Sequence, residues 1–166
     1  MTTKALNIRP YSPADRRRIL SIWLSASRIG HPFLTEGELA SQYAQVRDVY
    51  LADAEIWVAE ENGVPVGFIG FPEDGFIGAL FVDPAQQGRG IGHTLITHAA
   101  RLKGALSVEV YAANDKAHSF YKSCGFTETS RRDLDDEGRA FPIIHMVRNN
   151  SPAGKTGTDA ASDPSA

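Results

Sequence analysis

Residues 87–92, which read QGRGIG, combine glycines with an arginine in a pattern suited to binding an anion. Apolar residues at helical spacing follow, so the segment is predicted to lead into a helix. The first amides of a helix have no intrahelical partner, and the helix dipole places partial positive charge there. Because glycine lacks a Cβ atom, the backbone can also approach a ligand closely. We therefore expect a phosphate or pyrophosphate site here, with the charge of Arg89 nearby.

The glycine spacing does not match the two most familiar phosphate-binding loops. A Walker loop needs G-x-x-x-x-G-K-[ST], and no lysine follows Gly92. A dinucleotide fingerprint needs G-x-G-x-x-G, whereas the glycines fall at 88, 90 and 92 and position 93 is histidine. On this segment alone, a glycine-rich turn with a purely structural role is an alternative.

A second group of residues suited to chemistry lies further along the chain. Asn114, Ala117 and Tyr121 are spaced i, i+3 and i+7, which places them on one face of a predicted helix. Asn114 is a favourable N-cap residue. The tyrosine hydroxyl, with a reference pKa of ~10, is protonated at pH 7 and can donate a proton. We expect the neighbouring Phe120 and Phe126 to pack in the core.

Both groups are expected to be positioned by strands that end next to them. The apolar run 79–82 (ALFV) favours a buried strand that Asp83-Pro84 ends, and residues 106–111 (LSVEVY) favour another. A crossover helix to about Leu102 joins them, so the second strand is expected to run parallel to residues 76–82. The two loops then leave the same end of neighbouring strands, where ligands bind in open α/β sheets.

The remaining segments predict the rest of an α/β (α+β) domain. Strands are expected at residues 5–9, 55–60, 64–71, 76–82 and 106–111, after Gly125, and at 141–147. Helices are expected from about residue 12 to 30, 35 to 50, 91 to 102 and 114 to 122. The sum is a mixed, mostly antiparallel central sheet of about seven strands with helices on both faces. Residues 1–148 would form a single domain, and residues 149–166 a disordered C-terminal tail.

Composition narrows the class of protein. A chain of 166 residues with a net charge of −3 and no long basic run indicates one globular domain and disfavours nucleic acid as a partner. The single cysteine, Cys124, excludes an intrachain disulfide, and we expect a buried, inert thiol. No apolar run approaches ~18 residues, and the N-terminus lacks a signal-peptide core. We therefore expect a soluble, cytoplasmic protein with no membrane partner; the histidine spacing also predicts no metal site.

Considered together, the two segments resemble those of the GNAT superfamily of acyl-CoA-dependent N-acetyltransferases. The pattern Gln87-x-x-Gly90-x-Gly92 is similar to the family's pyrophosphate loop. Residues 114–126, with the pattern N-x-x-A-x-x-F-Y-x-x-x-G-F, are similar to its second block. The order of predicted elements agrees along residues 5–147. The sequence looks closest to small stand-alone bacterial members, some of which are regarded as protein-lysine acetyltransferases.

The resemblance implies acetyl-CoA as the co-substrate, with no metal. The pyrophosphate would be held by loop amides, those of Gln87, Gly88, Arg89, Gly90, Ile91, Gly92 and His93. The pantetheine arm would hydrogen-bond Asn114 and pair, like an added strand, with the backbone of Leu80, Phe81 and Val82. The sheet would be splayed between its strands 4 and 5 to leave a slot for this arm.

The resemblance also implies that Tyr121 is the general acid that protonates the leaving thiolate. The base is less clear, because many family members carry a glutamate on the strand before the loop, and residues 76–79 (FIGA) contain no carboxylate. His31 is a candidate as base or substrate contact, and Glu73, Asp74 and water relays are others.

The function implied is transfer of an acetyl group from acetyl-CoA to a primary amine by direct attack. The acceptor could be a protein lysine, a protein N-terminus or a small-molecule amine, bound by the segments 27–42 and 133–141. The acidic residues at 133–137 either attract a cationic amine or form a solvated turn. A non-catalytic acyl-CoA-binding sensor is the alternative function, and a nucleotide-binding protein is a third. Both a monomer and a homodimer are compatible with the sequence.

Overall fold

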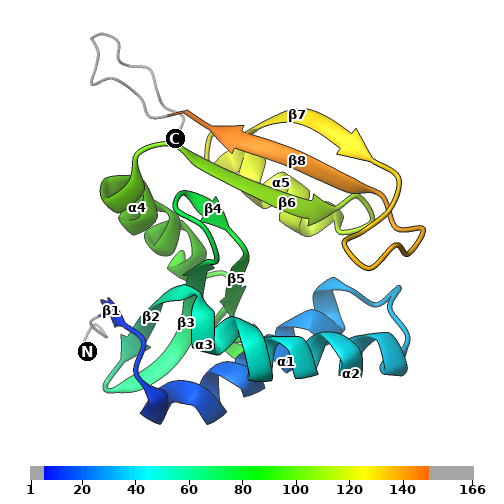
Figure 1. Ribbon diagram of the computed structural model, residues 1–166. Helices are drawn as coiled ribbons and strands as arrows, with labels where there is room; N and C mark the ends of the chain where they lie inside the picture. The colour runs from blue at the N-terminus through cyan, green and yellow to red at the C-terminus, as the bar shows by residue number, and fades with distance from the viewer. Residues whose placement is uncertain (1–5, 150–166) are drawn as a thin grey trace, which may run out of the picture. The chain divides into compact units, whose positions relative to one another are not determined.

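The computed structural model describes residues 6–149. The chain divides into two compact units, the first ending at His98 and the second beginning at Ala99. Each unit contains antiparallel strands and buried apolar side chains, and the helix α4 (Ile91–Lys103) begins in the first unit and ends in the second (Figure 1). Apart from Asn149, the predicted C-terminal tail lies outside the described residues.

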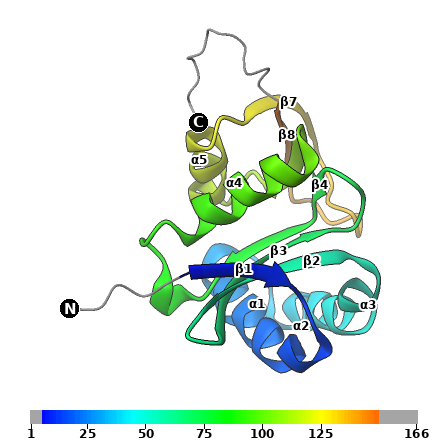
Figure 2. The same ribbon diagram turned by 90° about the vertical axis from the view of Figure 1, so that its left-hand side faces the viewer.

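The first unit is built on a four-stranded antiparallel sheet in the order β1-β2-β3-β5. Its strands are β1 (Leu6–Pro10), β2 (Glu55–Glu61), β3 (Val64–Phe71) and β5 (Ala79–Val82), with the two-residue β4 (Phe76–Ile77) before β5. Its helices are α1 (Arg16–Gly30), α2 (Glu36–Gln45) and α3 (Leu51–Asp53), with a π-helical turn η2 (Val46–Tyr50) and the 3-10 turns η1 (Pro13–Asp15) and η3 (Pro84–Gln86). Figure 2 shows α1, α2 and α3 on one face of this sheet.

The predicted start of the second helix is confirmed. The Thr35 side chain accepts a hydrogen bond from the Glu38 amide at 3.0 Å, and the Glu38 carboxylate accepts one from the Thr35 amide at 2.8 Å. This reciprocal capping box satisfies two amide donors that would otherwise lack partners at the helix start. The helix does not stay regular, however, because the π-helical turn η2 follows α2, a feature that hydrophobic periodicity does not reveal.

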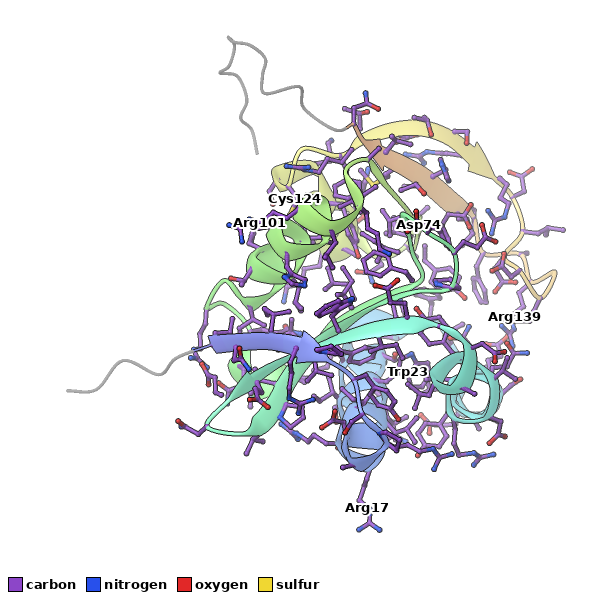
Figure 3. The ribbon with its side chains drawn as sticks, turned by 60° about the vertical axis from the view of Figure 1, so that its left-hand side comes forward. Arg17, Trp23, Asp74, Arg101, Cys124 and Arg139 are labelled. Carbon is purple, nitrogen blue, oxygen red and sulfur yellow. The ribbon has the colours of Figure 1, made fainter. Side chains whose placement is uncertain are left out.

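Aromatic side chains join α1 to the sheet. Phe68 on β3 is fully buried, and the ring of Phe81 on β5 stacks on it with centroids 5.7 Å apart. Trp23 on α1 contacts Phe81 at 6.2 Å and Tyr43 on α2 at 6.0 Å. Figure 3 labels Trp23 in this layer and shows Arg17, on the same helix, pointing away from the sheet. The strand before the glycine loop is therefore anchored to the helical layer.

The opposite face of the first sheet is covered by the start of α4. A Cβ atom placed on Gly67 would lie 3.3 Å from the Ile91 side chain and 3.5 Å from that of Leu95. Both side chains are buried. Glycine on β3 thus allows the helix that follows the loop to pack closely on the sheet, and helices lie on both faces as predicted.

The strand expected at residues 76–82 is interrupted in the structure. Gly78 separates β4 from β5, and its amide donates to the carbonyl oxygen of Gly70 on β3 at 2.9 Å. A Cβ atom on Gly78 would lie 2.6 Å from Pro72, so the strand is interrupted at a position where only glycine fits. The interruption gives eight strands in the described residues, against about seven predicted.

The second unit places three antiparallel strands beside one helix. Its elements are β6 (Leu106–Tyr111), α5 (Asp115–Ser123), β7 (Thr127–Arg132) and β8 (Ile143–Arg148). β8 pairs with β6 on one side and β7 on the other, and Figure 1 shows α5 along this sheet. Cys124, just after α5, is buried as predicted, and burial raises the pKa of its thiol.

The acidic segment between β7 and β8 is a hydrogen-bonded turn. The buried carboxylate of Asp135 accepts hydrogen bonds from the Arg139 amide at 2.8 Å, the Glu137 amide at 3.0 Å and the Tyr111 hydroxyl at 3.2 Å. Burial alone would raise the pKa of Asp135, but these hydrogen bonds and that of the Arg139 guanidinium outweigh it and lower the pKa. Asp136 is paired with Arg132 at 2.6 Å. These contacts favour a structural turn over an amine-attracting surface.

We predict that Asp135→Asn lowers the free energy of unfolding by about 1.5–3 kcal/mol, because buried amide and hydroxyl donors lose a charged acceptor. Urea unfolding of the variant and wild type at pH 7 measures this. The pKa of Asp135 is lowered by folding, so its contribution is complete above ~3.9, the pKa of an unfolded aspartate, and disappears as the pH falls further. The control Asp136→Asn, whose side chain is 83% exposed, should change stability by less than about 0.5 kcal/mol. Equal losses in the two variants would contradict a structural role for Asp135.

Candidate functional site

The glycine loop adopts the backbone conformation that an anion site needs. Gly88 and Gly90 have φ values of +84° and +83°, in the left-handed region that side chains disfavour. A Cβ atom added to either glycine would meet no atom within 4 Å. The glycines are therefore required by backbone conformation and not by crowding, and the loop presents its main chain to open space.

The start of α4 supplies the amide donors that the sequence predicts. The first helical hydrogen bond runs from the Thr94 amide to the Gly90 carbonyl oxygen, at 3.0 Å. The amides of Ile91 and Gly92 precede this bond, so they have no carbonyl of an earlier helical turn to bind. Partial positive charge accumulates at this end of the helix. Residues 88–92 thus form one backbone segment at the start of α4, with the conformation and polarity that an anion site would need.

Side-chain contacts hold the loop against the sheet. Gln87 donates from its amide nitrogen to the Val82 carbonyl oxygen at 3.2 Å, which closes the turn that follows β5. Arg18 on α1 bonds the Asp83 carboxylate at 2.7 Å, and the same carboxylate caps the turn η3 through the Ala85 amide. The Gln87 side chain therefore shapes the loop, and its backbone amide, predicted to face the anion, donates to the Pro84 carbonyl oxygen at 3.5 Å instead.

Arg89 is ion-paired in the structure. Its guanidinium bonds both carboxylate oxygens of Glu61, one of them at 3.0 Å, and also contacts Gln86. Glu61 is buried at the end of β2, and its hydrogen bonds raise the pKa of Arg89. The positive charge expected at the loop is therefore largely neutralised by a residue that the sequence analysis did not identify. No local signal could have found Glu61, which lies 28 positions earlier in the chain.

β5 offers a second set of backbone groups beside the loop. It pairs with β3 on one side only, in the register Gly67↔Val82, Phe68↔Phe81 and Ile69↔Leu80. Within the described part of the first unit it is the edge strand of the four-stranded sheet, so its outer amides and carbonyls have no strand partner in that sheet. An extended ligand can therefore add to this edge as a further strand would.

In the second unit, Asn114 and Tyr121 occupy the two ends of α5. The Asn114 side chain accepts a hydrogen bond from the Ala117 amide at 3.1 Å, so its predicted role as N-cap is confirmed. Tyr121 is 6% exposed, and its ring packs nearly perpendicular to those of Phe120 and Phe126, each with centroids 5.2 Å away. Phe126 is buried in the core as expected, and the Tyr121 ring belongs to the same aromatic cluster.

The candidate bases lie in the first unit. His31 follows α1, and its amide bonds the Ser27 carbonyl oxygen at 2.8 Å. Its ring lies beside that of Phe33, and burial lowers the pKa of the imidazole to about 4. Glu73 and Asp74 are exposed in the turn between β3 and β4, where Figure 3 labels Asp74. At pH 7 His31 is neutral and can accept a hydrogen bond.

Residues 6–149 offer neither a metal site nor a membrane-spanning helix. No cluster of three or more His, Cys, Asp or Glu side chains in this range could hold a metal ion. Over the same range, every helix is too short or too polar to cross a membrane.

Comparison with known proteins gives consistent matches. A family model described as "Acetyltransferase (GNAT) domain" matches residues 52–128. The peptidyl-lysine N-acetyltransferase YjaB of Salmonella typhimurium is 34% identical over 143 residues, which cover 86% of this chain and 97% of that protein. The peptidyl-lysine N-acetyltransferase YiaC of Escherichia coli is 38% identical over 119 residues, which cover 72% of this chain and 82% of that protein. The solution structure of apo-form YjaB from Escherichia coli matches with a TM-score of 0.79 and 31% identity. The match covers 86% of this chain and 97% of that one.

We predict that the imidazole of His31 titrates near pH 4, well below its usual 6.5, because burial disfavours the charged form. As the pH falls, His31 of the unfolded chain is protonated near pH 6.5, before His31 of the folded chain. The contribution of the neutral ring to the free energy of unfolding is therefore complete above pH 6.5 and is lost as the pH falls toward 4. The loss should reach about 3 kcal/mol at most, and it should be absent from His31→Asn. NMR titration gives the pKa, and urea unfolding at several pH values gives the stability. A midpoint near 6.5 would show that the ring is solvated.

Proposed function

Because the chain belongs to the GNAT acetyltransferase family, we propose that it transfers an acetyl group from acetyl-CoA to a primary amine, with protein lysine as the favoured acceptor. The observation that carries this proposal is the backbone of the first unit. It combines left-handed glycines before α4 with β5, whose outer edge has no strand partner in the four-stranded sheet of the described residues. An ester of pyrophosphate with a long amide-containing arm is the kind of ligand that uses both.

The cofactor would bind along these two features in order. Its pyrophosphate accepts hydrogen bonds from the loop amides of residues 88–93, where no side chain of Gly88 or Gly90 stands in the way. The Gln87 amide already donates to the Pro84 carbonyl oxygen at 3.5 Å. Its pantetheine arm pairs with the outer edge of residues 80–82 on β5. Asn114, at the start of α5, hydrogen-bonds the same arm through the part of its side chain that does not cap the helix.

Protein lysine is favoured because two relatives carry that activity in their names. The chain covers nearly the whole length of YjaB, so the comparison includes the segments that would bind the acceptor. The chemistry requires a neutral amine, and a free lysine amine has a pKa of ~10.4. His31, neutral and with a pKa of about 4, retains a proton poorly at pH 7. We therefore propose it as a hydrogen-bond acceptor that orients the amine, with water carrying the proton away.

Tyr121 is proposed as the general acid. The amine nitrogen attacks the acetyl carbonyl carbon, the carbon–sulfur bond breaks, and the Tyr121 hydroxyl gives its proton to the departing sulfur. Its aromatic neighbours fix the ring, so the hydroxyl is held by packing at the end of α5. The tyrosine then recovers a proton from the amide-forming nitrogen through water, which balances the reaction.

We predict that Gly90→Ala weakens CoA binding by tenfold or more, because the added methyl group disfavours the left-handed backbone that aims the loop amides. The matched control is Gly63→Ala. Gly63 has φ +81° in the hairpin between β2 and β3, and it also has no atom within 4 Å of its added Cβ. Both variants carry similar backbone strain, but only Gly90→Ala should change the Kd for CoA in isothermal titration. Equal Kd values for the two variants would remove the loop from the cofactor site.

We predict that Tyr121→Phe lowers kcat by ~10²–10⁴ with a lysine peptide, since a positioned acid contributes this much. The Kd for CoA should change by less than about twofold, because the hydroxyl acts only when the sulfur leaves. Thiol release from acetyl-CoA gives the rate. Wild-type binding of acetyl-CoA without thiol release, across lysine peptides and small amines, would instead support an acyl-CoA sensor.

A further inference from the structure

Tyr50 carries a buried hydroxyl group that the reaction described above does not use. It is the last residue of the π-helical turn η2. Its hydroxyl oxygen is buried and has no hydrogen-bond partner among the described residues. Phenylalanine would fill the same space without leaving a polar atom unsatisfied, so the hydroxyl is unfavourable for the ligand-free protein. Irregular π-helical turns of this kind are frequent at functional sites.

Two glycines make room for this hydroxyl. A Cβ atom on Gly70 would lie 2.5 Å from the Tyr50 oxygen, and one on Gly78 would lie 2.8 Å from it. The hydroxyl is therefore in contact with bare backbone at the point where the strand between residues 76 and 82 is interrupted. The Gly78 amide already donates to the Gly70 carbonyl oxygen at 2.9 Å. Any side chain at position 70 or 78 would displace the phenol from this position.

The interruption lies where the acyl end of the cofactor is expected. The loop that would hold the pyrophosphate follows the C-terminal end of β5, so the arm must run back along the strand toward Ala79. β5 spans four residues, or ~13 Å at ~3.3 Å per residue. An arm that pairs along this length brings its thioester to the N-terminal end of β5, beside Gly78 and the hydroxyl of Tyr50.

We propose that the Tyr50 hydroxyl donates a hydrogen bond to the acyl carbonyl oxygen of bound acyl-CoA, which makes Tyr50 a residue that distinguishes acylated from free CoA. This inference rests on the proposed function. The carbonyl oxygen supplies the partner that the hydroxyl lacks, and the bond strengthens as the amine attacks and negative charge develops on that oxygen. The role differs from that of Tyr121, which gives a proton to sulfur.

The ionisation of Tyr50 agrees with a donor role. Burial raises the pKa of its phenol above the ordinary value, so the group stays protonated throughout the working pH range. A phenol donates one hydrogen bond and cannot be replaced by phenylalanine in that role. The substitution Tyr50→Phe therefore removes the proposed bond and leaves the ring that packs on the two glycines.

The test compares the affinities of the full-length chain for CoA and for acetyl-CoA by isothermal titration. For Tyr50→Phe we expect the preference for acetyl-CoA over CoA to fall about three- to tenfold relative to wild type, the size of one hydrogen bond. The Kd for CoA itself should change by less than about twofold, and stability should not fall. Tyr11→Phe is the matched control, because it removes the hydroxyl of another half-buried tyrosine of the first unit, and it should keep the wild-type preference.

The outcomes separate this inference from the proposed activity. An unchanged preference in Tyr50→Phe would overturn the inference, as would an equal loss of affinity for both ligands, which would show a packing role. If wild type binds acetyl-CoA but transfers no acetyl group to a lysine peptide, the activity fails while the affinity ratio still decides the role of Tyr50. If wild type binds neither ligand, both proposals fall. Where transfer occurs, kcat of Tyr50→Phe should fall by tenfold or more with the KM for the peptide unchanged.

Discussion

The backbone groups that lack a strand or helix partner within residues 6–98, the described part of the first unit, are the constraint on which its architecture depends. Buried amides and carbonyls are almost always paired, because leaving them unsatisfied is unfavourable. Among residues 6–149, the outer edge of β5 lacks a strand partner and the first turn of α4 lacks helical partners, while the turn η3 between them is closed by its own hydrogen bonds. β5 is held in place by the three strands on its other side. It is also held by the aromatic contacts of Phe81 with Trp23 and Phe68. The open donors are thus aligned before any ligand arrives.

The charges around the loop are arranged to fix its shape. Arg18 holds Asp83, and Glu61 holds Arg89, so the side chains nearest the loop pair with one another. A pyrophosphate at this position would therefore interact mainly with backbone dipoles and with the positive end of α4. Such donors need no reorganisation when the ligand binds, and they depend less on side-chain ionisation than a cluster of lysines would. The net charge of the whole protein, −3, is consistent with recognition that relies on local dipoles.

Local sequence signals predicted the local structure. The helix start at Thr35, the N-cap at Asn114 and the glycine loop all depend on residues close together in the chain, and all three form as expected. Features that depend on distant residues were not predicted. The pairing of Arg89 with Glu61, the hydrogen bonds around Asp135 and the contact of Tyr50 with Gly70 and Gly78 each join separate elements. The predicted strand at residues 76–82 includes Gly78, because the contacts with Pro72 and the Tyr50 hydroxyl that exclude a side chain there leave no mark in the local pattern.

The burial of Cys124 has a practical consequence for the study of this enzyme. It is the only cysteine in the sequence, it is 4% exposed, and burial raises the pKa of its thiol. Thiolate is the form that reacts with disulfide reagents and alkylating agents, so the folded protein contributes almost no background signal at neutral pH. In an assay with a chromogenic thiol reagent, the signal will therefore come only from the coenzyme A released by turnover. The same sulfur becomes reactive when the second unit opens, which makes its labelling rate a probe of unfolding.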